Sequence, residues 1–397
     1  MTLSRNAKNA FMLGALCSIA YFSVYIARNI LSAVTPAMIE LGYEEAYIGS
    51  ISSLYFVFYA IGQLINGMIG DKINAKWMIF LGLALAGITN FIFPYVTANK
   101  LTATIIYSVT GFFLSMIYGP MTKVVSENTE PIHAVRCSIG YTFSSLFGSP
   151  MAGIIAAVFA WNTAFSVSSI ALFTMAIAVF LIFTIFEKRK IIKYNQFTVK
   201  ERGTFNFKIL LKNGIIKYSL VSILTGIVRT SVVFWLPTYI AQYLGFSSDK
   251  AAGIFTIATF VISFTAVIAI FVYERLGRNA NLSLFLMFIA SLLFFILTYF
   301  VKSSIPNIIF MILAIMSADS AASILWSVYC PSLRDTGMVS SATGFLDFLS
   351  YMAAAVANLI FANALSHVGW KNLILIWCAL SVIGVIISVP FKKRKNI

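Results

Sequence analysis

The stretch YFSVYIARNILSAVTPAMIELG, residues 21–42, is an apolar run with one arginine, Arg28, followed eight residues later by Pro36. The second half of the chain repeats this feature, because Arg229 precedes Pro237 by eight residues and lies 201 residues after the first arginine. A guanidinium cannot lose its proton in a protein, so a membrane-embedded arginine requires an anionic partner or a water-filled cavity. The sequence therefore predicts one arginine from each of two related halves at a shared site.

The composition places the chain in a lipid bilayer. Hydrophobic residues make up 60% and charged residues 10% of its 397 residues, against roughly 45–50% and roughly 25% in soluble domains. Apolar runs of about 20 residues, long enough to cross a bilayer as helices, recur along the whole chain. Twelve spans are expected at about 11–37, 47–70, 77–97, 101–122, 138–160, 164–186, 216–241, 250–273, 281–300, 305–328, 339–365 and 370–390. The first run is too long for a signal-peptide core, so we expect it to remain in the mature protein.

The distribution of lysine and arginine sets the orientation. With the N-terminus in the cytoplasm, 22 of the 28 Lys and Arg fall in inner segments and four in outer ones; Arg28 and Arg229 complete the number. This bias predicts a multi-pass protein of the cytoplasmic membrane with both termini inside. The net charge of +15 follows from the same topology. Because the basic residues flank spans and form no patch interleaved with aromatic residues, we expect the lipid bilayer as a partner and no nucleic acid.

The residues needed for catalysis or metal binding are sparse. The four cysteines form no CxxC pair, and the two histidines, His133 and His367, fall in expected loops. No Ser/His/Asp set is evident, and no phosphate-cradling glycine loop precedes a helix. We therefore expect no enzyme activity, no cofactor and no metal site.

The chain also has the pattern of an internal duplication. The polar stretch 187–215 predicts a cytoplasmic linker between an N-terminal bundle of six spans, 1–186, and a C-terminal bundle with a short basic tail, 216–397. Leu-Gly-Tyr at 41–43 recurs as Leu-Gly-Phe at 244–246. Six spans return the chain to its starting side, so the halves are related by an axis along the membrane normal. The expected fold is an all-α membrane protein of twelve helices in two pseudo-symmetric bundles, which resembles the major facilitator architecture; we expect a monomer.

The segment after the second span resembles the major facilitator loop motif GxxxDRxGRR. Glycines allow close helix approach there, while an acid and bases lie at cytoplasmic helix ends. A degraded copy follows the eighth span. We expect a gating latch rather than a substrate contact. The residues concerned are Gly67, Asp71, Lys72 and Lys76, and in the second copy Glu274, Arg275 and Arg278.

Two of the expected spans carry polar stripes. Helical spacing places each stripe on one helix face, and a polar face on an apolar helix should line a cavity rather than contact lipid. For the tyrosines alone, packing between helices and contact with substrate are equal alternatives. The stripes are Tyr21, Tyr25, Arg28 and Ser32 in the first span, and Tyr55, Tyr59, Gln63 and Asn66 in the second.

The region 21–95 resembles the organophosphate:phosphate antiporter family, which includes glycerol-phosphate and hexose-phosphate carriers. Residues 21–42 are similar to its pattern Y-x3-Y-x2-R-[KN]-x2-S/A-x-A-x-P, and residues 59–90, YAIGQLINGMIGDKINAKWMIFLGLALAGITN, are similar to YGxxKxxxGxxxDRxNxR. Further matches lie at 111–120 and at 228–239, VRTSVVFWLPTY. The resemblance extends weakly over all twelve spans.

The resemblance implies roles for individual residues. In that family two arginines clamp the substrate phosphate, a role that would pass here to Arg28 and Arg229. Tyr21, Tyr25 and Tyr59 match positions that line the family's cavity. The implied function is a secondary active transporter that moves a phosphorylated or carboxylated metabolite by alternating access, with phosphate as the expected exchange partner.

Four residues depart from the family pattern. Gln63 replaces a lysine of the second span, and Ser144 replaces a histidine of the fifth. Asp319 and Asp347 are additional acids within expected spans. The departures favour a monoanion, a zwitterion or a proton-coupled substrate. For the two acids, a static ion pair such as Asp319 with Arg229, proton coupling and substrate contact are all open.

Two other functions are compatible with this fold. Gly140, Gly148, Pro150 and Gly153 partly resemble the glycine-proline motif of drug:proton antiporters. A non-transporting sugar-phosphate sensor is a further alternative, since the hexose-phosphate system contains one. Phosphate-stimulated flux, flux driven by a pH gradient, and no flux would distinguish the three.

Overall fold

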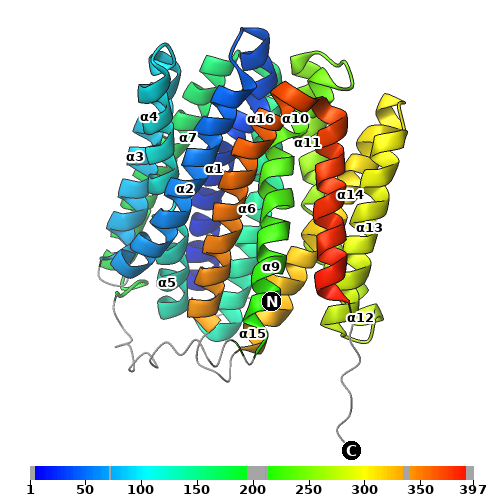
Figure 1. The fold of residues 1–397 in the computed structure, drawn as a ribbon. Helices are drawn as coiled ribbons and strands as arrows, with labels where there is room; N and C mark the ends of the chain where they lie inside the picture. Colours follow the sequence, from blue (N-terminus) through cyan, green and yellow to red (C-terminus); the bar gives the residue numbers. More distant parts are fainter. Residues whose placement is uncertain (1–4, 71–72, 195–210, 212, 334–338, 390–397) are drawn as a thin grey trace, which may run out of the picture. The chain divides into compact units, whose positions relative to one another are not determined.

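A computed structural model describes residues 5–70, 73–194, 211, 213–333 and 339–389. All regular secondary structure in these ranges is helical (Figure 1). This agrees with the physical requirement of a bilayer, because a helix satisfies its own backbone hydrogen bonds where no water is present.

The helices are bounded as follows. The first seven are α1 (Arg5–Glu40), α2 (Glu45–Gly70), α3 (Ala75–Val96), α4 (Lys100–Leu114), α5 (Tyr118–Asn128), α6 (Pro131–Val158) and α7 (Trp161–Lys188). The next are α9 (Ile215–Gly226), the π-helix η1 (Ile227–Val232), α10 (Val233–Gln242), α11 (Ser248–Ile262) and α12 (Thr265–Arg275). The last are α13 (Ala280–Phe300), α14 (Ser304–Ile324), the π-helix η2 (Leu325–Tyr329), α15 (Cys330–Ser332) and α16 (Val339–Ser388).

The expected spans correspond to these helices, and the predicted fold class is confirmed. Within the described residues, eleven helical segments are long and apolar enough to cross a bilayer. The remaining span, expected at 138–160, falls in α6, and among the described residues of this helix the apolar segment is Phe147–Val158. Two boundaries are less regular than the sequence indicates. Span four breaks between α4 and α5, and spans eleven and twelve run together as α16, which changes direction at Gly369 with φ 74°.

Backbone contacts divide the chain into two compact units. The first contains Met1–Glu201 and Leu236–Phe260, and the second contains Arg202–Trp235 and Val261–Ile397. Most of the expected linker, 187–215, lies outside the described residues. The boundaries of the two six-helix bundles therefore stay a prediction.

The first unit is held together by close helix contacts at small residues. In it, α1 packs on α6 and α7, α3 on α4 and α7, and α2 on α4. Gly148 of α6 lies so near Tyr25 of α1 that an added Cβ would lie 2.4 Å from the tyrosine Cβ. Polar side chains also join helices, since the Asn90 amide donates to Ser168 Oγ at 2.7 Å and to Ser169 Oγ at 3.0 Å. Such small residues and buried hydrogen bonds hold helices together where lipid removes the hydrophobic driving force.

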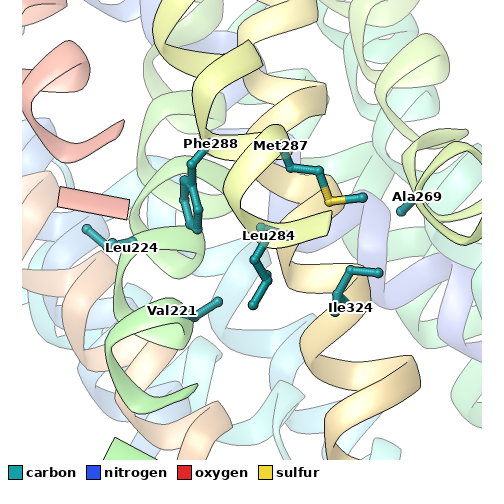
Figure 2. Close-up of a cluster of buried hydrophobic side chains, with 8 residues drawn as sticks. Val221, Leu224, Ala269, Leu284, Met287, Phe288 and Ile324 are labelled. Atoms are coloured by element: carbon teal, nitrogen blue, oxygen red, sulfur yellow. The ribbon is translucent and has the colours of Figure 1, made fainter. Parts of the chain in front are cut away.

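The second unit repeats several of these pairings. Its α9 packs on α16, α13 on α14 and α16, and α12 on α14. An apolar cluster lies where α9, α13 and α14 meet (Figure 2). The labelled members of this cluster are Val221, Leu224, Ala269, Leu284, Met287, Phe288 and Ile324. These packed side chains fix the helix that leads into Arg229.

Replacing Gly111 by alanine should destabilise the first unit. The new Cβ would lie 2.5 Å from the Tyr55 backbone oxygen and 3.0 Å from its ring, so α2 and α4 must move apart. Overpacking of this kind costs about 1–3 kcal/mol, which a lower apparent melting temperature of the purified protein would report.

Gly253→Ala is the matched control, because its Cβ has no atom within 4 Å. Alanine is favoured over glycine inside a helix by roughly 0.5–1 kcal/mol. Equal melting temperatures for the two variants would contradict the packing described here.

Candidate functional site

Arg28 lies among aromatic rings from two helices. Its guanidinium carbon is 5.3 Å from the ring centroid of Tyr59, 5.8 Å from that of Phe56 and 5.9 Å from that of Tyr25. The arginine is half-buried on α1, and Tyr59 is buried on α2. Cation–π attraction contributes about 0.5–2 kcal/mol, more as water is excluded. The structure thus brings together Arg28, Tyr25 and Tyr59, three residues that the sequence analysis selected.

A second group of tyrosines adjoins Tyr25. The Tyr21 ring centroid lies 5.1 Å from that of Tyr25, 5.4 Å from that of Tyr118 and 6.4 Å from that of Tyr141. Tyr118 and Tyr141 are themselves 6.2 Å apart. Neither Tyr118 nor Tyr141 was expected at the site. The available signals were the position of Tyr118 just before Gly119 in the family-like stretch 111–120, and the position of Tyr141 three residues before Ser144.

The break between α4 and α5 places Tyr118 at the start of a helix. Asn66 of α2 donates to Ser115 Oγ at 2.7 Å and to the Phe112 carbonyl oxygen at 3.3 Å. Ser115 Oγ also donates to that carbonyl oxygen at 2.6 Å. Gly62 makes room for the serine, because a Cβ at that position would lie 2.2 Å from Ser115 Oγ. Asn66, expected on a cavity-facing stripe, therefore braces the broken span.

Two residues of the first unit, Ser144 and Gln63, depart from the family pattern, and their surroundings differ. Ser144 is buried and donates from Oγ to the Ser18 carbonyl oxygen at 2.6 Å, which joins α6 to α1. Gln63 is half-buried on α2, one helical turn after Tyr59. Asn29 follows Arg28 and donates to the Tyr25 carbonyl oxygen at 2.8 Å and to Ser149 Oγ at 3.1 Å. Ser144 and Asn29 thus both join α1 to α6, and Asn29 does so next to the arginine.

Arg229 lies in the π-helix η1, unlike Arg28, which lies in a regular α-helix. Ser231 anchors η1 by donating to the Ala354 carbonyl oxygen of α16 at 2.8 Å. Arg229 interacts electrostatically with Asp319 of α14. π-Helical turns within α-helices are frequent at functional sites. The three alternatives for Asp319, an ion pair, proton coupling and substrate contact, stay open.

The other acid, Asp347, is half-buried on α16. It interacts electrostatically with Cys330, whose thiol is hydrogen-bonded with Thr343. Among the described residues, no group of three His, Cys, Asp or Glu side chains is arranged to hold a metal ion.

The loop motif includes a short ion pair at the end of α7. Lys76 Nζ lies 2.6 Å from Glu187 Oε2, and the hydroxyl of Tyr194 donates to Glu187 Oε1 at 2.8 Å. Burial, followed by the bond to the Glu187 carboxylate, raises the pKa of Tyr194 above its ordinary value. This arrangement ties the segment after α7 to the start of α3. Asp71 and Lys72 lie outside the described residues, and Gly67 lies near the end of α2.

The degraded copy of the motif ends α12 at the surface. Glu274, Arg275 and Arg278 are exposed. The Arg275 guanidinium carbon lies 5.1 Å from the ring centroid of Phe271. Gly277 and Arg278 take positive φ values of 66° and 58°, which terminate the helix.

The apolar helices that are long enough to cross a bilayer define the class of this protein, a multi-pass membrane protein. The chain belongs to the Major Facilitator Superfamily, because the sequence model of that family matches residues 17–358. A bacterial homologue of the human lysosomal transporter Spinster, in an inward-facing and unoccupied conformation, has the same fold. The TM-score is 0.77 at 11% identity, with 97% of each chain covered.

Curated relatives resemble the chain over most of its length. It is 20% identical to the glycerol-3-phosphate transporter of Bacillus subtilis (strain 168), over 95% of this chain and 91% of the relative. It is 22% identical to the phosphoglycerate transporter protein of Salmonella typhimurium (strain LT2), over 91% of this chain and 84% of the relative. It is 19% identical to the membrane sensor protein UhpC of Escherichia coli (strain K12), over 94% of this chain and 90% of the relative. The predicted family resemblance is confirmed.

The ion pair between Lys76 and Glu187 should contribute measurably to stability. Its side chains are only 11% and 29% exposed, so removing one partner leaves a poorly hydrated charge. A double-mutant cycle with Lys76→Ala and Glu187→Ala should give a coupling free energy of about 1 kcal/mol or more in thermal or chemical denaturation.

The pair between Lys100 and Glu44 provides the control. Its atoms are 3.2 Å apart and its side chains are 62% and 69% exposed. Exposed pairs contribute about 0–1 kcal/mol. If the two cycles gave the same coupling, the Lys76–Glu187 pair would have no special role in holding α3 to α7.

Proposed function

We propose that this protein is a secondary active transporter that moves a small organic anion, a phosphorylated or carboxylated metabolite, across the cytoplasmic membrane by alternating access. Exchange for phosphate is the proposed coupling, and a monomer with both termini in the cytoplasm is the proposed form. The names of the glycerol-3-phosphate and phosphoglycerate relatives support a phosphorylated substrate. The observation that carries the proposal is Arg28 held among the rings of Tyr25, Phe56 and Tyr59.

The chemistry of anion capture follows from the guanidinium group. Its planar fork of donors matches a carboxylate or phosphate and forms short, charge-assisted hydrogen bonds. In the proposal, Arg28 and Arg229 bind the same anion, one arginine from each repeat. Closing the empty transporter would then desolvate two like charges together, whereas the loaded form carries an anion between them. Crossing is therefore fast only with substrate bound, which gives obligatory exchange.

Asp319 adjusts the charge that the substrate experiences. Because it interacts with Arg229, an incoming anion competes with this carboxylate. Gln63 also supplies an amide where the family has a lysine. A site with two guanidiniums and one carboxylate has a lower net positive charge than a site with additional cations. It therefore fits a substrate of lower negative charge better. The proposed site thus favours monoanions over fully ionised phosphate esters.

The alternative of a drug:proton antiporter finds no support in the positions of its glycines. Gly148 accommodates Tyr25, and Gly153 packs against Ala252 and Thr256, where an added Cβ would lie 2.2 Å from Thr256 Oγ1. Thr256 Oγ1 also donates to the Pro150 carbonyl oxygen at 3.3 Å. These residues serve helix packing. Reconstituted protein that shows phosphate-stimulated flux without a pH gradient would separate the exchanger from both an antiporter of protons and a sensor.

Substituting Arg28 tests the exchanger directly. Arg28→Ala should lower phosphate exchange in proteoliposomes by at least about 30-fold, because losing one partner of a buried charged pair costs about 2–5 kcal/mol. Arg28→Lys should retain weak binding, since lysine keeps the charge but loses the bidentate fork. Arg189→Ala, at an exposed arginine beyond α7, is the control; undiminished exchange by Arg28→Ala would refute the proposal.

Asp319→Asn distinguishes competition from proton carriage. If the carboxylate competes with substrate for Arg229, the amide variant should bind inorganic phosphate several-fold more tightly in calorimetry. Asp249→Asn, at an exposed acid of α11, should leave the affinity unchanged. Weaker phosphate binding together with loss of flux driven by a pH gradient would instead identify Asp319 as a proton carrier.

A further inference from the structure

Three tyrosines from three helices form a compact group, which we name the tyrosine cluster: Tyr21 of α1, Tyr118 of α5 and Tyr141 of α6. Their ring centroids are 5.4, 6.4 and 6.2 Å apart. The rings of Tyr21 and Tyr141 meet at 70°, and those of Tyr118 and Tyr141 at 76°, so edges and faces are both presented. Only Tyr21 was expected to contact substrate.

Tyr141 has a buried hydroxyl group. The residue is 5% exposed, and its hydroxyl has no hydrogen-bond partner among the described residues. Buried hydroxyl groups are nearly always paired, because leaving one unpaired forfeits its bonds to water. An unpaired hydroxyl beside a candidate substrate-contacting residue is explained if a ligand supplies the missing partner.

Tyr118 is the exposed member of the tyrosine cluster. Tyr118 is 41% exposed although it lies within span four. The next residue, Gly119, is also exposed, and an added Cβ there would have no atom within 4 Å. The bonds from Asn66 to Ser115 and Phe112 fix the break that begins α5 and so fix where Tyr118 lies.

The tyrosine cluster is continuous with the surroundings of Arg28. The Tyr21 ring centroid is 5.1 Å from that of Tyr25, and the Tyr25 ring centroid is 5.9 Å from the Arg28 guanidinium carbon. Seven residues separate Tyr21 from Arg28, which is roughly 10 Å along a helix axis. Side chains on a helix lean toward its N-terminus, so the arginine leans toward the cluster. A substrate with its anionic group at Arg28 therefore extends a carbon chain of a few atoms toward these rings.

We infer that the tyrosine cluster is a specificity subsite for the hydroxylated carbon chain of the substrate, with Tyr118 and Tyr141 as specificity-determining residues. The inference rests on the proposed function, in which Arg28 binds the anionic group. The Tyr141 hydroxyl hydrogen-bonds to a substrate hydroxyl, and the rings of Tyr21 and Tyr118 pack on C–H groups. A site built to bond a hydroxyl discriminates against an analogue that lacks it, because its own polar group is then left unpaired.

Paired ligands that differ only in hydroxyl groups test the subsite. Calorimetry on purified protein would compare glycerol 3-phosphate with propyl phosphate, and glycerate with propanoate, using inorganic phosphate as the reference. The wild type should prefer the hydroxylated member of at least one pair. Tyr141→Phe should reduce this preference about 3- to 10-fold, the range of one neutral hydrogen bond, and leave phosphate affinity within about twofold. Tyr118→Leu should weaken both esters relative to inorganic phosphate.

Tyr47→Phe is the matched control. Tyr47 is 7% exposed on α2 and its hydroxyl likewise has no hydrogen-bond partner among the described residues, but it lies outside the tyrosine cluster. The preference should survive this change. An unchanged preference in Tyr141→Phe, no preference in the wild type, or equal effects of the two phenylalanine variants would overturn the subsite while leaving anion transport intact. A wild type that binds none of these anions would overturn the proposed function, and the subsite with it.

Discussion

A positive charge that cannot be neutralised by deprotonation constrains this protein more than any other single feature. At Arg28 the compensation described by the structure includes the negative faces of three aromatic rings, which are weaker partners than a carboxylate. An arrangement of this kind helps to keep a guanidinium in place within an apolar bundle. The close packing of α1 on α6 serves this purpose, because Gly148 and Asn29 fix the helix that carries both Arg28 and Tyr25.

The two repeats hold their arginines in different ways. Arg28 lies in an uninterrupted α-helix among aromatic rings, whereas Arg229 lies in a π-helix and interacts with Asp319. The groups around the two arginines therefore differ, although the arginines lie at corresponding positions of the two repeats. The second repeat places the acid Asp319 near its arginine, so the two guanidiniums have different surroundings.

The sequence was sufficient for the parts of the structure that depend on length and hydropathy. Twelve apolar runs predicted the helices, because a bilayer leaves few other ways to satisfy a spanning backbone. The stripe that contains Tyr25 and Arg28 could also be predicted from the sequence, since helical periodicity fixes which side chains share a face. The sequence did not reveal the break in span four, because Asn66 and Ser115 come from different helices and only tertiary packing joins them. For the same reason Ser144 could not be recognised as a bond between α6 and α1, nor Tyr141 as a neighbour of Tyr21.

The interruption at residues 115–117 divides span four into two segments whose neighbours differ in part. Both α4 and α5 contact α2 and α3, and α5 also contacts α1 and α6. An uninterrupted helix would transmit any tilt of one end to the other. An interrupted helix would let α5 tilt without α4, and under the proposed function the ring of Tyr118 would then adapt to substrates of different length.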